Sequence, residues 1–131
     1  AYIVQRQTGA LMADYLQPRL FDPLGIAPPF WLVTEDGANR GGGGAFMVPR
    51  DLAKVGFLYL NGGVWDGARI VSGDWVDRST RAQASGVGAF SGVNFGGGPY
   101  GYHWWVAESA GGPAFVAFGY GGQYVYVVPA L

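Results

Sequence analysis

The chain has no cysteine, and it has only one histidine and one lysine among its 131 residues. The lack of cysteine excludes disulfides, thiol catalysis and cysteine metal sites, but it leaves both the periplasm and the cytoplasm open. A single histidine, His103, with scattered carboxylates makes a poor metal-binding set. We therefore expect no metal and no cofactor.

Charged residues are also scarce, at 13% of the chain against roughly 25% in a typical soluble domain. The net charge is −1 and no basic patch exists, so nucleic acid and anionic membranes are not expected partners. No apolar run approaches the roughly 20 residues that a membrane helix needs. With so little charge to cover its surface, the chain is expected either to have much of that surface covered by other protein or to be a piece of something larger.

The order of sequence patterns predicts an α+β fold in a single domain, with helices and loops over 1–99 and antiparallel strands over 100–131. Four helical segments are predicted, at 1–7, 11–21, 49–60 and 73–81. Pro18 predicts a boundary or kink within the second. The third begins with a proline and ends at an Asn-Gly-Gly stop.

Turn residues separate these helices from the predicted strands. Asp66-Gly67 predicts a short hairpin, and Ser72 is placed to cap the last helix. Residues 34–44 and 83–99 are rich in glycine and polar residues and are predicted as loops. Strands are predicted at 100–108, 114–118 and 123–128.

No complete catalytic set is present. None of the serines considered lies in a Gly-x-Ser-x-Gly elbow, namely Ser72, Ser79, Ser85, Ser91 and Ser109. A Ser-x-x-Lys pair is excluded, because Asp51 stands three residues before Lys54. A Tyr-x-Asn triplet occurs at Tyr59-Leu60-Asn61, where helix packing and a stop signal are the simpler interpretation.

Aromatic residues and the lone histidine gather in the first predicted strand. One interpretation is that a sugar stacks on Tyr100, Tyr102, Trp104 and Trp105. However, aromatic residues in strands more often belong to the hydrophobic core. His103 lies among them, and we expect a structural or surface role for it.

A glycine cluster at 119–122 precedes the last predicted strand, in the stretch GYGGQYVYVVP. Glycine weakens a strand, so its presence there indicates that something approaches the backbone closely. One interpretation is a bend or bulge. The other is that bare backbone lets a substrate carbonyl reach an N–H donor, as in an oxyanion hole.

Four stretches together resemble one family. Serine hydrolases of the β-lactamase-like superfamily have similar stretches in the same order and at similar spacing. In this sequence the stretches are YLQPRLFDPLGI, GGAFMVPRDLAKVGFLYLNGGVWDGARIVSGDWV, YGYHWW and FGYGGQYVYVVP. The branch of class C-related esterases and 6-aminohexanoate-dimer hydrolases is the most similar. The resemblance implies part of a β-lactamase/transpeptidase-like fold, in which an active site lies between a helical region and an antiparallel sheet.

The resemblance also implies site residues. The family's Lys-Thr-Gly box falls on Tyr120-Gly121-Gly122, which would bind substrate, and Gln123 would give its backbone N–H to the oxyanion hole. Tyr120 departs from the lysine. A neutral phenol hydrogen-bonds but does not pair with a carboxylate, which favours a small ester or amide substrate over a penicillin.

The family's nucleophile motif Ser-x-x-Lys is absent from this sequence, and the Tyr59-Leu60-Asn61 triplet does not stand where the family has its Tyr-x-Asn motif, before the helix that ends at Thr8-Gly9. The resemblance thus predicts a C-terminal fragment of a bacterial hydrolase, inactive alone. Its expected partner is the missing N-terminal part or a companion chain. The alternative is a non-catalytic, aromatic-rich binding domain, for example for glycans.

Overall fold

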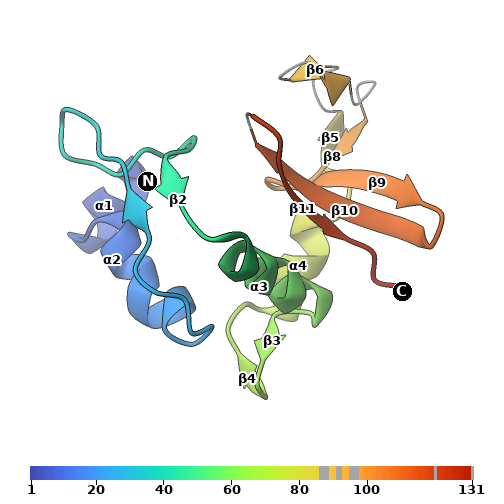
Figure 1. Ribbon diagram of the computed structural model, residues 1–131, viewed down its shortest axis with the longest axis horizontal. Coiled ribbons are helices and arrows are strands. Elements are labelled where there is room, and N and C mark those ends of the chain that lie inside the picture. The colour runs from blue at the N-terminus through green and yellow to red at the C-terminus, as the bar shows by residue number, and fades with distance from the viewer. Residues whose placement is uncertain (86–88, 91–92, 95–97, 120, 131) are drawn as a thin grey trace. The chain divides into compact units, whose positions relative to one another are not determined.

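The computed structural model describes residues 1–85, 89–90, 93–94, 98–119 and 121–130. The chain forms two compact units, Ala1–Lys54 and Val55–Leu131, and each is described by itself. Figure 1 labels their elements. Helices are followed by antiparallel strands, which confirms the α+β prediction. No described helix combines the length and the apolar character needed to cross a bilayer.

The first unit begins with α1 (Tyr2–Thr8), α2 (Met12–Leu16) and the π-helix η1 (Gln17–Phe21). Gly9 caps α1 in the left-handed conformation at φ 71°, and its N–H donates to the Gln5 carbonyl. The change from α to π geometry occurs next to Pro18, which confirms the predicted boundary. Phe21, Leu24, Ile26 and Ala38 are buried in this unit.

A two-stranded ribbon, β1 (Phe30–Trp31) and β2 (Ala45–Phe46), flanks the polar loop of the first unit. Neither strand was predicted from the sequence pattern. Phe30 and Phe46 pair across the ribbon with ring centroids 5.5 Å apart. Within the loop, the buried Asn39 accepts a hydrogen bond at 2.9 Å from the Ala13 N–H.

Helix α3 (Pro49–Leu60) agrees with its prediction. Asp51 lies in its first turn, where the helix dipole favours an acid, and pairs with Lys54 at 2.7 Å. Lys54 also donates to the Gly25 carbonyl at 2.7 Å. Asn61 closes the helix, with its side-chain amide donating to the Phe57 carbonyl at 2.8 Å.

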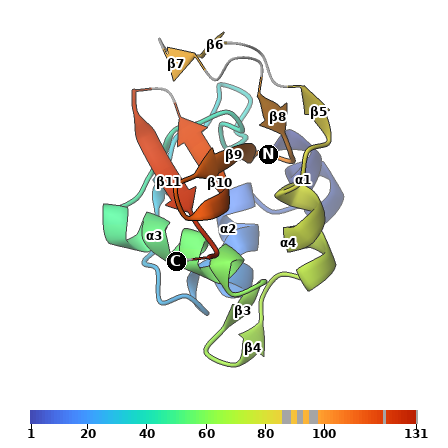
Figure 2. The same ribbon diagram turned by 90° about the vertical axis from the view of Figure 1, so that its right-hand side faces the viewer.

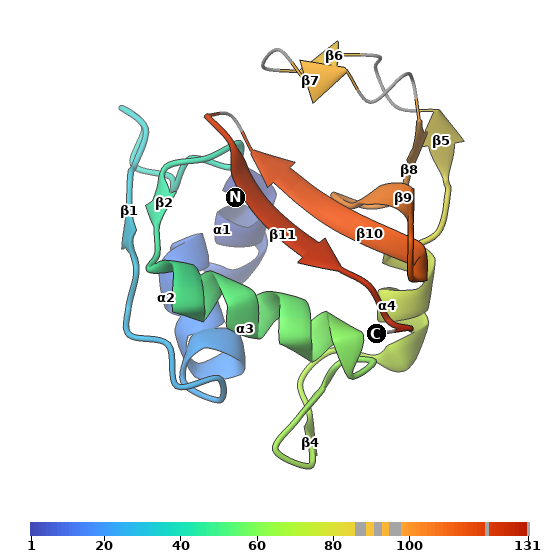
Figure 3. The same cartoon turned by 45° about the vertical axis from the view of Figure 1, so that its right-hand side comes forward.

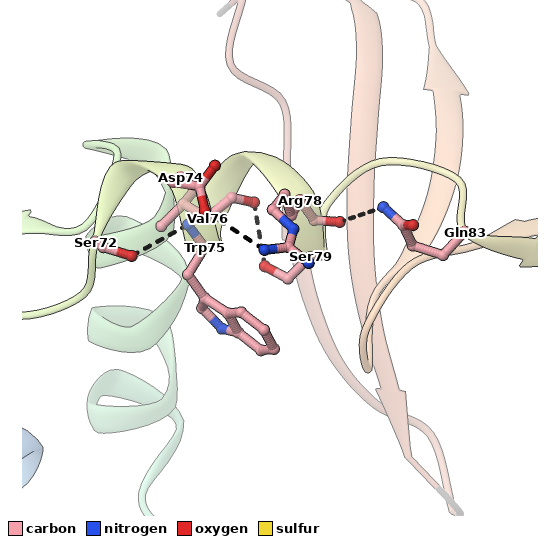
Figure 4. A network of polar contacts seen from close by, with 7 residues as sticks. All are labelled: Ser72, Asp74, Trp75, Val76, Arg78, Ser79 and Gln83. Atoms are coloured by element: carbon pink, nitrogen blue, oxygen red, sulfur yellow. Dashed lines mark hydrogen bonds and ion pairs between the residues drawn. The ribbon is translucent and has the colours of Figure 1, made fainter.

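The predicted hairpin follows as β3 (Val64–Trp65) and β4 (Ala68–Arg69). Its turn residues adopt positive φ angles, 47° at Asp66 and 76° at Gly67, as an Asp-Gly hairpin turn requires. Helix α4 (Gly73–Ser79) begins at the predicted cap, where Ser72 Oγ accepts from the Trp75 N–H at 3.2 Å (Figure 4). It ends two residues before the predicted Arg81.

Five strands form the main sheet of the second unit, in the order β11-β10-β9-β8-β5 (Figure 2). They are β5 (Ala84–Ser85), β8 (Pro99–Tyr100), β9 (Trp105–Ser109), β10 (Gly112–Gly119) and β11 (Gln123–Val127). All its pairings are antiparallel. A separate ribbon joins β6 (Ala89–Phe90) and β7 (Val93–Asn94).

Two strand predictions need correction. Residues 83–99 are not all loop, because β5, β6, β7 and the start of β8 lie there. Glycine-rich composition hid these two-residue strands, which are too short to show a periodicity. The strand predicted over 100–108 is interrupted by a turn at 101–104, where the Gly101 N–H donates to the Trp104 carbonyl at 2.7 Å.

Helix α3 packs on one face of the sheet (Figure 3). The Tyr59 ring lies 4.7 Å from Trp104 and 6.4 Å from Phe115, measured between centroids. Trp104, Phe115 and Val127 are the buried centre of this cluster. Since side chains alternate along a strand, Gln123 lies in the same row of β11 as Val125 and Val127.

The 101–104 turn joins this sheet to α4. The Tyr102 N–H donates to the Ser79 carbonyl at 2.9 Å, and a Cβ on Gly101 would stand 2.0 Å from that same oxygen. His103 occupies the turn at φ 65°, a left-handed conformation that costs a residue with a Cβ about 1–2 kcal/mol. His103 therefore lies in a turn, which corrects its predicted place in a strand.

We expect Gly101→Ala to lower the free energy of unfolding by about 2–3 kcal/mol, because the new methyl group must displace the Ser79 carbonyl. Gly42→Ala is the matched control, since nothing lies within 4 Å of its added Cβ. Denaturant unfolding of the intact protein measures both. Equal stabilities of the two variants would contradict the close approach.

His103→Gly should raise the free energy of unfolding by about 0.5–1 kcal/mol, because glycine adopts the left-handed turn conformation without strain. His103→Ala keeps the strain and serves as the control. Thermal unfolding compares the two variants. A glycine variant less stable than the alanine variant would show that the strain does not exist.

Candidate functional site

The turn between β10 and β11 is built by glycines at residues where other amino acids would be strained. Gly121 and Gly122 adopt φ angles of 84° and 89°. The Gly122 N–H donates to the Gly119 carbonyl at 3.2 Å, and Gly119 pairs with Gln123 in the ladder. Tyr120 lies outside the described residues. The sequence thus folds here into a tight connection that leads directly into β11.

The group that approaches this bare backbone is the side chain of Gln123. A Cβ on Gly119 would lie 3.3 Å from Gln123 Oε1, and a Cβ on Gly121 would lie 3.4 Å from Gln123 Nε2. Both ends of the carboxamide therefore lie beside the space that the two glycines leave open. Gln123 is exposed, and among the described residues no hydrogen bond holds its carboxamide.

On the opposite face of the same hairpin, Phe118 and Tyr124 pair in register and stack with centroids 4.7 Å apart. Tyr124 and Tyr126 remain 49% and 52% exposed. The β11 strand is the last in the described order of the sheet, so its outer edge has no neighbour within this order. These exposed tyrosines and this edge are available to other protein or to a ligand.

The serines with known contacts form hydrogen bonds with backbone groups. Ser72 caps α4, the fully buried Ser79 donates to the Val76 carbonyl at 3.1 Å, and Ser109 donates to the Gly112 carbonyl at 2.9 Å. Ser85 lies in β5, and Ser91 lies outside the described residues. No described serine is hydrogen-bonded to the lone lysine or the lone histidine.

The Tyr59-Leu60-Asn61 triplet has the structural role that its sequence context predicts. Tyr59 packs in the core against Trp104 and Phe115, while Asn61 ends α3. His103 is exposed in its turn, and the described residues contain no group of three or more potential metal ligands among His, Cys, Asp and Glu.

The four aromatics of the YGYHWW stretch divide between core and surface. Trp104 and Trp105 are buried, and Tyr100 packs edge-on against Trp105 at 4.8 Å. Tyr102 is 38% exposed and stacks on Trp75 of α4 with centroids 5.4 Å apart. Figure 4 shows the Trp75 indole pointing away from the polar contacts of its helix.

Sequence reasoning considered Gln123 for its backbone N–H and did not predict that its carboxamide lies beside Gly119 and Gly121. The sequence did contain a pattern that indicates this position, because Gly119 and Gly121 both precede Gln123 within four residues. The stacking of Trp75 on Tyr102 was also missed. It depends on the contact of α4 with the 101–104 turn, which no local pattern encodes.

Comparisons with known proteins find similarity to hydrolases. A 6-aminohexanoate-dimer hydrolase of Paenarthrobacter ureafaciens is 37% identical over 78 residues, which are 59% of this chain and 20% of that protein. A solved structure of a proposed 6-aminohexanoate-dimer hydrolase from Bacillus anthracis superposes with a TM-score of 0.80 at 25% identity. That match covers 99% of this chain and 33% of the Bacillus chain.

The chain therefore spans a fifth to a third of the length of these two relatives. The fold of the superposed region is that of β-lactamase-like proteins, as the sequence predicted. The family model named Beta-lactamase matches residues 1–131, the whole of the sequence. This chain belongs to the β-lactamase family of hydrolases.

Proposed function

We propose that this chain forms one wall of a serine hydrolase that cleaves an ester or amide bond through an acyl-enzyme. The observation that carries the proposal is the glycine-built turn that places the bare backbone of residues 121–122 beside the first residue of β11. By the sequence resemblance, the family's third active-site box would fall on this turn. A backbone without side chains admits a substrate carbonyl to an N–H donor.

Each part of the turn has a role in this mechanism. A serine from outside this sequence attacks the carbonyl carbon, and the negative charge that develops on the carbonyl oxygen is held by the serine's own N–H and that of Gln123. Gly121 and Gly122 leave room for the substrate. The Tyr120 phenol, neutral near pH 7, hydrogen-bonds the substrate.

The partner we propose is the remainder of the same hydrolase, either on one polypeptide or as a companion chain. Its nucleophile and its proton-transferring tyrosine complete the site. The exposed tyrosines of β11 and the outer edge of that strand are surfaces which such a partner would cover. The two relatives are named for 6-aminohexanoate dimer, which favours an amide as the bond cleaved.

Replacing the proposed oxyanion donor tests the mechanism. Gln123→Pro removes the N–H and should lower kcat on a p-nitrophenyl ester by about 10²–10³-fold in the intact hydrolase. Gln123→Ala keeps the N–H and is the matched control, with a much smaller loss. Thermal unfolding confirms that both variants fold. Equal activities of two folded variants would exclude the Gln123 N–H as a donor.

The 131-residue chain by itself should not hydrolyse p-nitrophenyl esters above the buffer rate, because it lacks the nucleophile motif. Adding the complementary part of the hydrolase should restore turnover. The measurement is release of p-nitrophenolate by chain purified in two independent ways. Turnover by the chain alone, retained after both purifications, would contradict the assignment of the nucleophile to the partner.

A second candidate function, glycan binding, rests on the exposed stack of Trp75 and Tyr102. Sugar rings pack their C–H faces on such aromatic surfaces. Isothermal titration with soluble oligosaccharides tests it, and this function predicts that Trp75→Ala abolishes binding. Tyr2→Ala, which removes a tyrosine that is 52% exposed elsewhere, is the control. No heat of binding to the unmodified protein would remove this candidate.

A further inference from the structure

We propose that the Gln123 carboxamide determines substrate specificity by hydrogen-bonding a neutral amide group in the acyl part of the substrate. This inference rests on the proposed function and deepens it. The same residue would then act twice, with its backbone N–H on the scissile carbonyl and its side chain on a second polar group of the substrate.

The Gln123 carboxamide lies beside two glycines of the turn. Oε1 would be 3.3 Å from a Cβ on Gly119, and Nε2 would be 3.4 Å from a Cβ on Gly121. A side chain at either glycine would crowd the amide, so these glycines allow it to lie across the turn. The φ of Gly121 also calls for glycine, but Gly119 has no such backbone requirement. Glycine at 119 thus leaves room for the carboxamide in its observed position.

The Gln123 side chain has unused hydrogen-bonding capacity. A carboxamide offers two N–H donors and an oxygen that accepts twice. Gln123 is exposed, and within the described chain none of these groups has a hydrogen-bond partner. A secondary amide, with one donor and one acceptor side by side, matches this arrangement.

The absence of charged side chains near Gln123 in the sequence favours a neutral ligand group over a charged one. No Asp, Glu, Lys, Arg or His occurs after Glu108, so the segments that form β10, the turn and β11 carry no side-chain charge. A carboxylate or ammonium group would lose hydration here without meeting an opposite charge on these strands. An amide needs only hydrogen bonds, which Gln123 supplies.

The test compares two esters of equal acyl length in the intact hydrolase. One is the p-nitrophenyl ester of N-acetyl-β-alanine, which carries a secondary amide, and the other is p-nitrophenyl hexanoate. We expect Gln123→Leu to lower the ratio of kcat/KM for the N-acetyl-β-alanine ester to kcat/KM for the hexanoate ester by about 3- to 10-fold. This is the effect of one lost neutral hydrogen bond. Hexanoate turnover serves as the internal reference, so any general loss of catalysis that the variant causes affects both esters and cancels in this ratio.

Two further variants separate side-chain chemistry from a general disturbance. Gly119→Ala crowds the carboxamide without removing it, so it should lower the same ratio. Gln7→Leu, at an exposed glutamine of α1, should leave the ratio unchanged. Thermal unfolding checks that every variant is folded.

The outcomes are distinct. If Gln123→Leu lowers both kcat/KM values equally, or changes neither, then the carboxamide does not recognise the amide and the inference is wrong. If the unmodified intact protein hydrolyses neither ester, the proposed function itself fails, and the inference fails with it.

Discussion

The contact of α3 with β11 at Gly56 is the constraint on which the rest of the second unit depends. A Cβ at this position would lie 2.6 Å from Val125 Cγ1, so only glycine permits the observed approach. That approach brings Tyr59 against Trp104 and Phe115 and buries Val127. The core side of β11 is thereby held against a helix, and the turn that precedes β11 begins from a fixed strand.

The oxyanion site that we propose on this turn would gain from that rigidity, because an oxyanion donor is effective only when it is held in place before the reaction. The glycines that shape the turn would make a strand weak, yet β11 is anchored on one face by α3 and paired with β10 along its length. The glycines that allow an unusual backbone conformation and the firmly held strand β11 therefore lie within five residues of each other. The exposed Gln123 lies where the two meet.

Much of this fold was predictable from the sequence, because its signals are local. A proline starts α3, Ser72 caps α4, and Asp66-Gly67 turns the β3–β4 hairpin, each where the pattern predicted. The two-residue strands of 83–99 and the turn within 100–108 were not predictable, since both depend on pairing with distant segments. The candidate site was likewise predictable only in part. A local glycine pattern identified the turn, whereas the position of the Gln123 carboxamide depends on the β10–β11 register.

The central claim is that the turn before β11 faces the reacting carbonyl of an ester or amide. A crystal structure of the intact hydrolase with a phosphonate transition-state analogue bound to its nucleophilic serine tests this most directly. The account predicts a phosphonyl oxygen at about 2.7–3.1 Å from the Gln123 backbone nitrogen. A phosphonate oxygen held elsewhere, with Gln123 N–H bonded within the sheet, would contradict it.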